Sequence, residues 1–132
     1  MTPKPGKYAL DTNVVIALLN GDAAVSERWA DAEVLLLPVP VLGELLYGAL
    51  RSSRRSDNEQ RVRIVVRHME LIECDGPVCE NYAQIKAALA TAGRPIPEND
   101  LWISACEAAA GAALVTRDDH FKHIPELVIE EW

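Results

Sequence analysis

The sequence predicts an α/β fold, a mostly parallel central sheet flanked by helices, formed as a single domain over residues 1–132. Short apolar runs that end in polar residues or proline alternate with longer segments whose apolar residues recur at helical spacing. The short runs are uninterrupted, as expected for strands covered on both faces. A chain of 132 residues is long enough for one hydrophobic core and short for two.

Five apolar runs are candidate strands, and six segments are candidate helices. The first strand lies around Leu10, and the others span 34–38, 71–74, 113–116 and 127–129. The predicted helices span 13–19, 22–32, 41–50, 58–69, 78–92 and from 98 or 99 to 111. Asp22 is placed to cap the second helix, Pro40 suits the start of the third, and Gly93 ends the fifth. The short connections between them predict helices on both faces of the sheet.

The composition of the chain indicates where in the cell the protein is located. No apolar stretch approaches the roughly 20 residues that span a bilayer. Residues 1–7 carry two prolines and two lysines and are not followed by the apolar run and cleavage site of a secretion signal. We therefore expect no membrane association and a cytoplasmic location. Cys74, Cys79 and Cys106 are odd in number and lack paired spacing, which favours buried free thiols over disulfides.

The charge is unevenly distributed. The net charge of −7 argues against a nucleic-acid partner, yet the segment 51–67 carries six arginines against only Asp57 and Glu59. One interpretation is a solvated helical face with internal charge pairs. The other is a surface that contacts phosphates beside an acidic metal pocket, where bound cations would offset part of the negative charge.

Asp11 and Glu44 are the first two acids with a candidate functional role. Asp11 directly follows the first candidate strand, and ligands of open α/β sheets bind at that carboxyl edge. Glu44 lies in an otherwise apolar helical stretch, where a carboxylate is costly unless it is paired, protonated or bound to a cation. The alternative for Glu44 is a place on the solvated face of an amphipathic helix.

Two further acids lie at comparable places. Asp100 is in the first turn of the last predicted helix, where an acid commonly caps the helix, although Asn99 would serve equally well. Asp118 and Asp119 follow the fourth candidate strand, where Asp is also favoured simply as a turn residue.

Taken together, the four acids fall at strand ends and helix starts that an α/β topology can bring to one edge. Clustered carboxylates repel one another, so such a pocket is stable chiefly when hard cations occupy it. Ligands other than His and Cys favour Mg²⁺ or Mn²⁺ over zinc. His120 and His123 are close in sequence to Asp118, and we interpret them as surface imidazoles.

These ordered motifs resemble those of PIN-domain ribonucleases. The motifs are Asp11-Thr12-Asn13, Glu44 in its apolar helix, the stretch 99–105, and Thr116-Arg117-Asp118 before Phe121. The small size, the stretch 93–96 and the closing segment 124–132 look most like the VapC-type toxins of bacterial toxin–antitoxin pairs. The resemblance covers essentially the whole chain.

The resemblance implies a metal-dependent endoribonuclease that hydrolyses RNA phosphodiester bonds. Asp11, Glu44, Asp100 and Asp118 would form its acidic catalytic and metal-binding site, with Mg²⁺ or Mn²⁺ as the cofactor. Thr12, Asn13 and Thr116 would be supporting polar residues. Some relatives place a further acid where this chain has His120, so either Asp119 takes its part or a second metal binds weakly.

The same resemblance implies protein partners, a homodimer and a cognate antitoxin that inhibits the nuclease. For the RNA backbone, the candidate contacts are Arg51, Arg54, Arg55 and Arg117. Two alternatives of other classes remain at this point. A receiver-like Mg²⁺-binding signalling domain would need a lysine after a late strand, where this chain has Arg117. An inactive α/β module that only binds a protein is the other.

Overall fold

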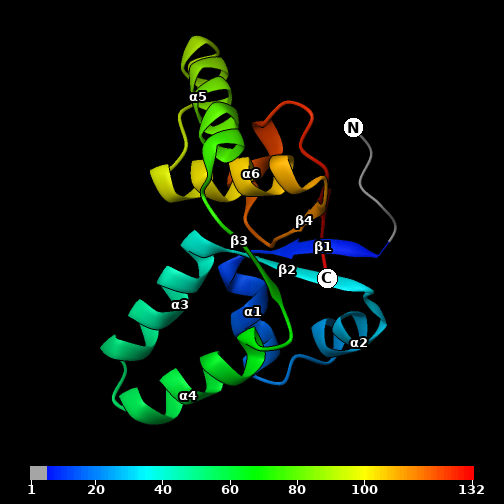
Figure 1. Ribbon diagram of the computed structural model, residues 1–132, viewed down its shortest axis with the longest axis vertical. Coiled ribbons are helices and arrows are strands. Elements are labelled where there is room, and N and C mark those ends of the chain that lie inside the picture. The colour runs from blue at the N-terminus through cyan, green and yellow to red at the C-terminus, as the bar shows by residue number, and fades with distance from the viewer. Residues whose placement is uncertain (1–5) are drawn as a thin grey trace.

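A five-stranded sheet forms the centre of the molecule in the computed structural model, which describes residues 6–132 (Figure 1). Its strands are β1 (Lys7–Leu10), β2 (Val34–Pro38), β3 (Glu70–Ile72), β4 (Ala113–Val115) and β5 (Ile129–Glu130). They lie in the order β3-β2-β1-β4-β5, and every neighbouring pair is parallel. The predicted parallel sheet is confirmed, with β1 in the middle.

Helices cover both faces of this sheet. They are α1 (Thr12–Leu19), α2 (Ala23–Asp31), α3 (Val39–Arg51), α4 (Arg55–Val66), α5 (Gly76–Thr91) and α6 (Glu98–Ala110), followed by a short 3₁₀ helix η1 (Asp119–His123). In Figure 1, α5 and α6 lie above the sheet and α1 to α4 lie below it. The three-layer α/β/α architecture is therefore the one that the sequence predicts.

The core explains why the central strands are apolar throughout. Leu10, Leu37 and Leu114 have no exposed surface, because β1, β2 and β4 are covered from both sides. The helix starts also follow from the sequence. The carboxylate of Asp22 accepts a hydrogen bond from the Val25 amide (3.1 Å), and that of Asp75 accepts one from Val78 (3.2 Å).

Several predicted boundaries are wrong. Helix α4 runs from Arg55 to Val66 instead of 58–69, because residues 67–69 form the turn that leads the chain into β3. Strand β3 ends at Ile72 rather than at residue 74, and β4 ends one residue before Thr116. Strand β5 begins at Ile129, although the Val128 carbonyl already accepts a hydrogen bond from Leu114. The helix η1 was not predicted.

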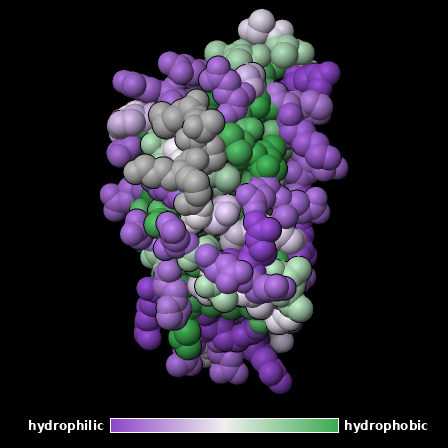
Figure 2. All heavy atoms as spheres, turned by 90° about the vertical axis from the view of Figure 1, so that its right-hand side faces the viewer, coloured by the Kyte–Doolittle hydropathy of each residue, from purple (hydrophilic) through white to green (hydrophobic). Residues whose placement is uncertain are grey.

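The surface differs from expectation at the cysteines. Cys74 and Cys79 are exposed and only Cys106 is buried, so the prediction of buried thiols is wrong for two of the three. Among the helices described between residues 6 and 132, none is long and apolar enough to cross a membrane. Figure 2 shows a mostly hydrophilic face with a hydrophobic patch in its upper half.

Candidate active site

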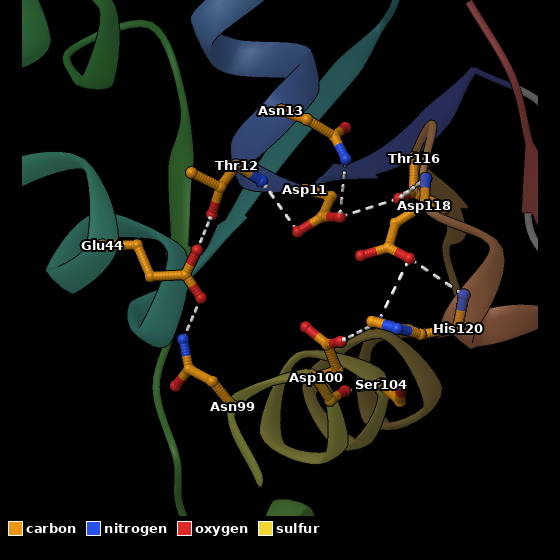
Figure 3. A network of polar contacts seen from close by, with 10 residues as sticks. All are labelled: Asp11, Thr12, Asn13, Glu44, Asn99, Asp100, Ser104, Thr116, Asp118 and His120. Atoms are coloured by element: carbon orange, nitrogen blue, oxygen red, sulfur yellow. Dashed lines mark hydrogen bonds and ion pairs between the residues drawn. The ribbon is translucent and has the colours of Figure 1, made fainter. Parts of the chain in front are cut away.

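The four predicted acids come together at the carboxyl edge of the sheet. Asp11 follows β1 and Asp118 comes three residues after β4, while Glu44 lies in the first half of α3, directly after β2. Asp100 lies in the first turn of α6. In Figure 3 their carboxylates point into one common space. This grouping follows from the strand order, which places β1 between β2 and β4.

Asp11 is the most deeply buried of these acids, with 5% of its surface exposed. Its Oδ1 accepts a hydrogen bond from the Thr12 amide (2.8 Å), so it also caps α1. Its Oδ2 accepts a hydrogen bond from the Thr116 hydroxyl (2.7 Å) and a longer one from the side-chain amide of Asn13 (3.4 Å). Burial raises the pKa of Asp11, these hydrogen bonds oppose the rise, and the nearby carboxylates of Asp100 and Glu44 add to it.

Glu44 is held by neutral donors on both sides. The Thr12 hydroxyl donates to its Oε2 (2.5 Å), and the Asn99 side-chain amide donates to its Oε1. Helices α1, α3 and α6 therefore meet at this carboxylate, as Figure 3 shows. The sequence-based role of Thr12 as a supporting residue is matched by this contact. The contribution of Asn99 was missed, because its position suggested only a helix cap.

His120 is the residue that sequence reasoning misjudged. Its Nδ1 lies 3.0 Å from Oδ2 of Asp100 and 3.2 Å from Oδ1 of Asp118, so the ring links the two carboxylates. One ligand atom from each of these three residues lies within 4.8 Å of the others. The predicted exposure of this imidazole is confirmed, but its contact with the two acids was not foreseen. The ring is half exposed, yet it faces the site, because η1 turns the chain back over Asp118.

Two polar residues connect the acids to the backbone. The Thr116 hydroxyl donates to Asp11 and accepts a hydrogen bond from the Asp118 amide (3.0 Å). The side-chain oxygen Oδ1 of Asn13 accepts a hydrogen bond from the backbone amide of Arg117 (3.2 Å). These contacts tie the start of α1 to the loop after β4, so the positions of Asp11 and Asp118 depend on each other.

Within residues 6–132, the side chains of the other residues predicted from the sequence do not contact the four acids. The Arg117 guanidinium donates to the Trp132 carbonyl oxygen and pairs with Asp22 (3.0 Å). Asp119 is exposed and pairs with Lys122 (2.8 Å), which lowers the pKa of that carboxyl. The remaining basic candidates lie exposed around the turn between α3 and α4, at the lower left of Figure 1, and are Arg51, Arg54 and Arg55.

The electrostatics of the group fit a bound cation. Partial burial raises the pKa of Asp100, and the charges of Asp118 and Glu44 raise it further. The hydrogen bond and charge of His120 oppose this rise. The hydrogen bond to Asp100 and the charge of Asp118 raise the pKa of His120. Carboxylate oxygens from three or four acids with one imidazole make a donor set suited to Mg²⁺ or Mn²⁺ and unlike the closed sites of structural zinc.

Comparison with known proteins agrees with this geometry. The family model of the PIN domain matches residues 8–127. The protein named ribonuclease VapC2 from Rickettsia felis is 31% identical over 130 residues, which cover 95% of this chain and 97% of that protein. The tRNA(fMet)-specific endonuclease VapC from Shigella flexneri is 30% identical over 129 residues, covering 96% and 98%.

Solved structures agree as well. A chain in the crystal structure of DNA-bound VapBC from Salmonella typhimurium superposes with a TM-score of 0.90 at 29% identity, covering 96% of this chain and 98% of that one. The agreement in sequence and in fold excludes the receiver-like alternative. The chain belongs to the PIN domain family and, within it, to the VapC proteins.

Proposed function

We propose that this protein is a metal-dependent endoribonuclease that acts as the toxin of a toxin–antitoxin pair. The observation that carries the proposal is the convergence of Asp11, Glu44, Asp100 and Asp118 at one edge of the sheet. Four carboxylates gathered in this way destabilise one another unless cations bind among them. The names of the VapC relatives, ribonuclease and endonuclease, supply the reaction class.

We assign Mg²⁺ or Mn²⁺ as the cofactor. Asp11, Asp100 and Asp118 are the proposed ligands, with Glu44 on the opposite side of the same space. A divalent cation bound here would lower the pKa of a coordinated water and stabilise charge on the phosphoryl oxygens. Thr116 and Asn13 hold the Asp11 carboxylate, and Thr12 and Asn99 hold that of Glu44, so the ligands are oriented before substrate binds.

Glu44 is the proposed general base. Water attacks phosphorus and passes a proton to the Glu44 carboxylate, while the bond from phosphorus to the leaving ribose oxygen breaks and that oxygen takes a proton from solvent. We prefer Glu44 to Asp118 for this role because its partners Thr12 and Asn99 are neutral donors. Asp118 instead shares the imidazole of His120 with Asp100.

The proposed substrate contacts are basic and exposed. Arg54 and Arg55 lie at the turn between α3 and α4 without ion-pair partners among residues 6–132, which leaves their guanidinium groups free for phosphates. Arg51 stacks over Tyr47 (5.4 Å) and keeps its charge at the surface. Arg117 would reach a phosphate only by leaving Asp22 and Trp132, so it ranks behind the other three.

We further propose that an antitoxin segment binds next to Glu44. A cavity of about 250 Å³ lies between α1, α3 and α4, and its lining includes Glu44 together with Leu19, Leu45 and Val62. Ile16 is half exposed at the same place. The matched solved structures include VapBC complexes, which supports an antitoxin partner for this chain. A homodimer and a cytoplasmic location also remain expectations, which rest on the similarity to VapC proteins.

The proposal is tested with purified protein and a mixture of labelled RNAs. Because the Shigella relative is named for tRNA(fMet), this tRNA belongs in the mixture. We expect cleavage with Mg²⁺ or Mn²⁺, no cleavage with EDTA, and a loss of at least 100-fold in Asp11→Asn, since the buried carboxylate is a ligand. Expression of the wild type should arrest growth, and expression of Asp11→Asn should not.

The matched control is Asp31→Asn, which makes the same chemical change at an exposed position at the end of α2. It should cleave like the wild type. Equal cleavage by Asp11→Asn, or cleavage that persists in EDTA, would contradict the proposed site. A protein that binds no Mn²⁺ would instead favour the inactive protein-binding module.

A further inference from the structure

Glu107 is a buried acid that the proposed nuclease does not use. It lies in α6, seven residues after Asp100, which places it about 10 Å further along the helix. Only 4% of its surface is exposed. Its carboxylate has no hydrogen-bond or ion-pair partner among residues 6–132, and burial alone raises its pKa to about 8. A buried carboxyl without a partner is unusual enough to require an explanation.

The carboxyl of Glu107 opens into a cavity. In the part of the chain that the structure describes, every completely buried side-chain polar atom has a hydrogen-bond partner, so the unpartnered oxygens of Glu107 must reach an open space. That space has a volume of about 220 Å³ and lies between α5, α6 and the segment from η1 to β5. Figure 2 shows a hydrophobic patch on the side of the molecule where this segment lies.

The cavity lining has one chemical character. Its walls are mainly apolar and include Ile85, Ile124, Leu127 and Val128. Both ionisable groups in the lining are acids, Glu107 and Glu126, and no basic side chain lies among them. Glu126 is exposed, so it stands nearer to solvent than Glu107 does. An anion finds no basic partner in this lining, and a neutral apolar molecule would leave the Glu107 carboxyl without a partner.

A metal ion also fits poorly, because Mg²⁺ and Ca²⁺ require six or more oxygen ligands and these walls offer few. An ammonium group on an aliphatic chain meets both requirements. Its charge favours the ionised form of Glu107 and pairs with it, and its methylene groups contact the apolar walls. We propose that this cavity binds an aliphatic primary amine, with one ammonium group at Glu107. Glu126 also lines the cavity and offers a second acid to a second ammonium group, so a short diamine is the preferred ligand.

The size of the cavity agrees with this ligand class. A volume of about 220 Å³ is below the roughly 300 Å³ at which pockets for drug-sized ligands begin, and it is ample for a four-carbon chain. The same chemistry is present in a free polyamine and in a lysine side chain of another protein. These two sources share the ammonium group but differ in what surrounds it.

The test is a titration of 1,4-diaminobutane followed by methyl NMR, in buffer free of other amines. The reporters are the methyl groups of Ile85, Ile124 and Leu127, which line the cavity. We expect saturable shifts at these methyls with the diamine, weaker binding of butylamine, and no binding of 1-butanol, which has the chain without the charge. Titration with Nα-acetyl-lysine amide distinguishes the sources, since tighter binding than the diamine would assign the site to a protein lysine.

Variants give the control. Glu107→Gln keeps the shape of the side chain and should weaken diamine binding at least tenfold, and Glu126→Gln should reduce it to the level of butylamine. Glu80→Gln removes the same charge from an exposed position on α5 and should bind like the wild type. The proposal is overturned if wild-type methyls show no saturable shift, if 1-butanol binds equally well, or if Glu107→Gln binds as tightly as Glu80→Gln.

Discussion

His120 changes the chemical character of the proposed metal site. A site of carboxylates alone offers only hard oxygen ligands, which suit Mg²⁺. The imidazole beside Asp100 and Asp118 adds a nitrogen donor within reach of the same position. Nitrogen ligands favour transition metals such as Mn²⁺ over Mg²⁺. At this single residue, the chain therefore has the means to set which of the two cations binds more tightly.

This gives a prediction about metal preference. Replacing His120 by alanine should weaken Mn²⁺ binding by about tenfold and Mg²⁺ binding by less, because only Mn²⁺ gains much from the nitrogen ligand. His120→Asp should shift the preference toward Mg²⁺. Calorimetric titration of both metals measures the ratio directly. His123→Ala is the control, since its ring contacts Arg94 outside the site. An unchanged ratio in His120→Ala would show that the imidazole is not a ligand.

The second prediction for a single residue concerns Glu107 and the pH dependence of the free energy of unfolding. Its pKa of about 8 in the folded protein lies above the ordinary value of 4.5, so the folded state binds more protons between these values. The free energy of unfolding should therefore fall as the pH rises from about 5 to 8. Glu107→Gln removes this loss, so its free energy of unfolding relative to the wild type should rise by about 4 kcal/mol between pH 5 and pH 9.

Urea unfolding at the two pH values measures that difference. Amine buffers must be avoided, because a bound amine would stabilise the ionised carboxylate. Glu80→Gln should follow the wild-type curve, since this side chain is exposed. Parallel curves for Glu107→Gln and the wild type would mean that Glu107 is ionised in the folded protein at pH 5.

At the scale of elements, the start of α5 depends on one side chain. Asp75 accepts a hydrogen bond from the Val78 amide and caps this helix, which packs along α6. Asp75→Ala should lower the free energy of unfolding by about 1 kcal/mol, and Asp75→Asn should lower it much less, because an amide oxygen also caps. Urea denaturation of both variants checks this. A loss that is equal in the two would assign the effect to charge instead of capping.

Elements that local signals define were predictable from the sequence. Asp22 caps its helix as predicted, and β2 ends at Pro38 as its composition indicates. The cap at Asp75 is an equally local signal, but it was overlooked, and the predicted start of α5 at residue 78 is two residues too late. Elements that tertiary contacts define were not. Helix α4 follows Arg54, which makes no capping hydrogen bond, so the sequence contains no mark of its start. The Asp118 carboxylate caps η1 and is a local signal, but the helix also depends on the burial of Phe121, which has no local signature.

At the scale of the whole molecule, the site was predictable because topology constrains it. Acids at the ends of parallel strands lie at one edge of the sheet, so Asp11 and Asp118 could be assigned to that edge from the sequence, and their closeness then follows from the pairing of β1 with β4. The contacts of Arg117 could not be predicted from the sequence. The chain returns at Trp132 to accept hydrogen bonds from this guanidinium, and that long-range contact is set by the path of β5 and the residues after it.

The last prediction concerns RNA binding and follows from the distribution of charge over the whole molecule. A protein with a net charge of −7 should bind RNA only through a local basic surface, and Arg54 and Arg55 are exposed at the turn between α3 and α4. Replacing both by alanine in an Asp11→Asn background should weaken binding of single-stranded RNA several-fold. The slope of log affinity against log salt should also become shallower by about 1.4, since each lost phosphate contact removes about 0.7.

Fluorescence anisotropy at several salt concentrations measures both quantities. The control removes two positive charges elsewhere, at Arg28 and Lys122, which pair with Glu130 and Asp119 on other parts of the surface. If the general charge of the protein decided binding, the two double variants would lose the same affinity and the same slope. A change confined to the Arg54 and Arg55 variant would place the RNA backbone along the turn between α3 and α4.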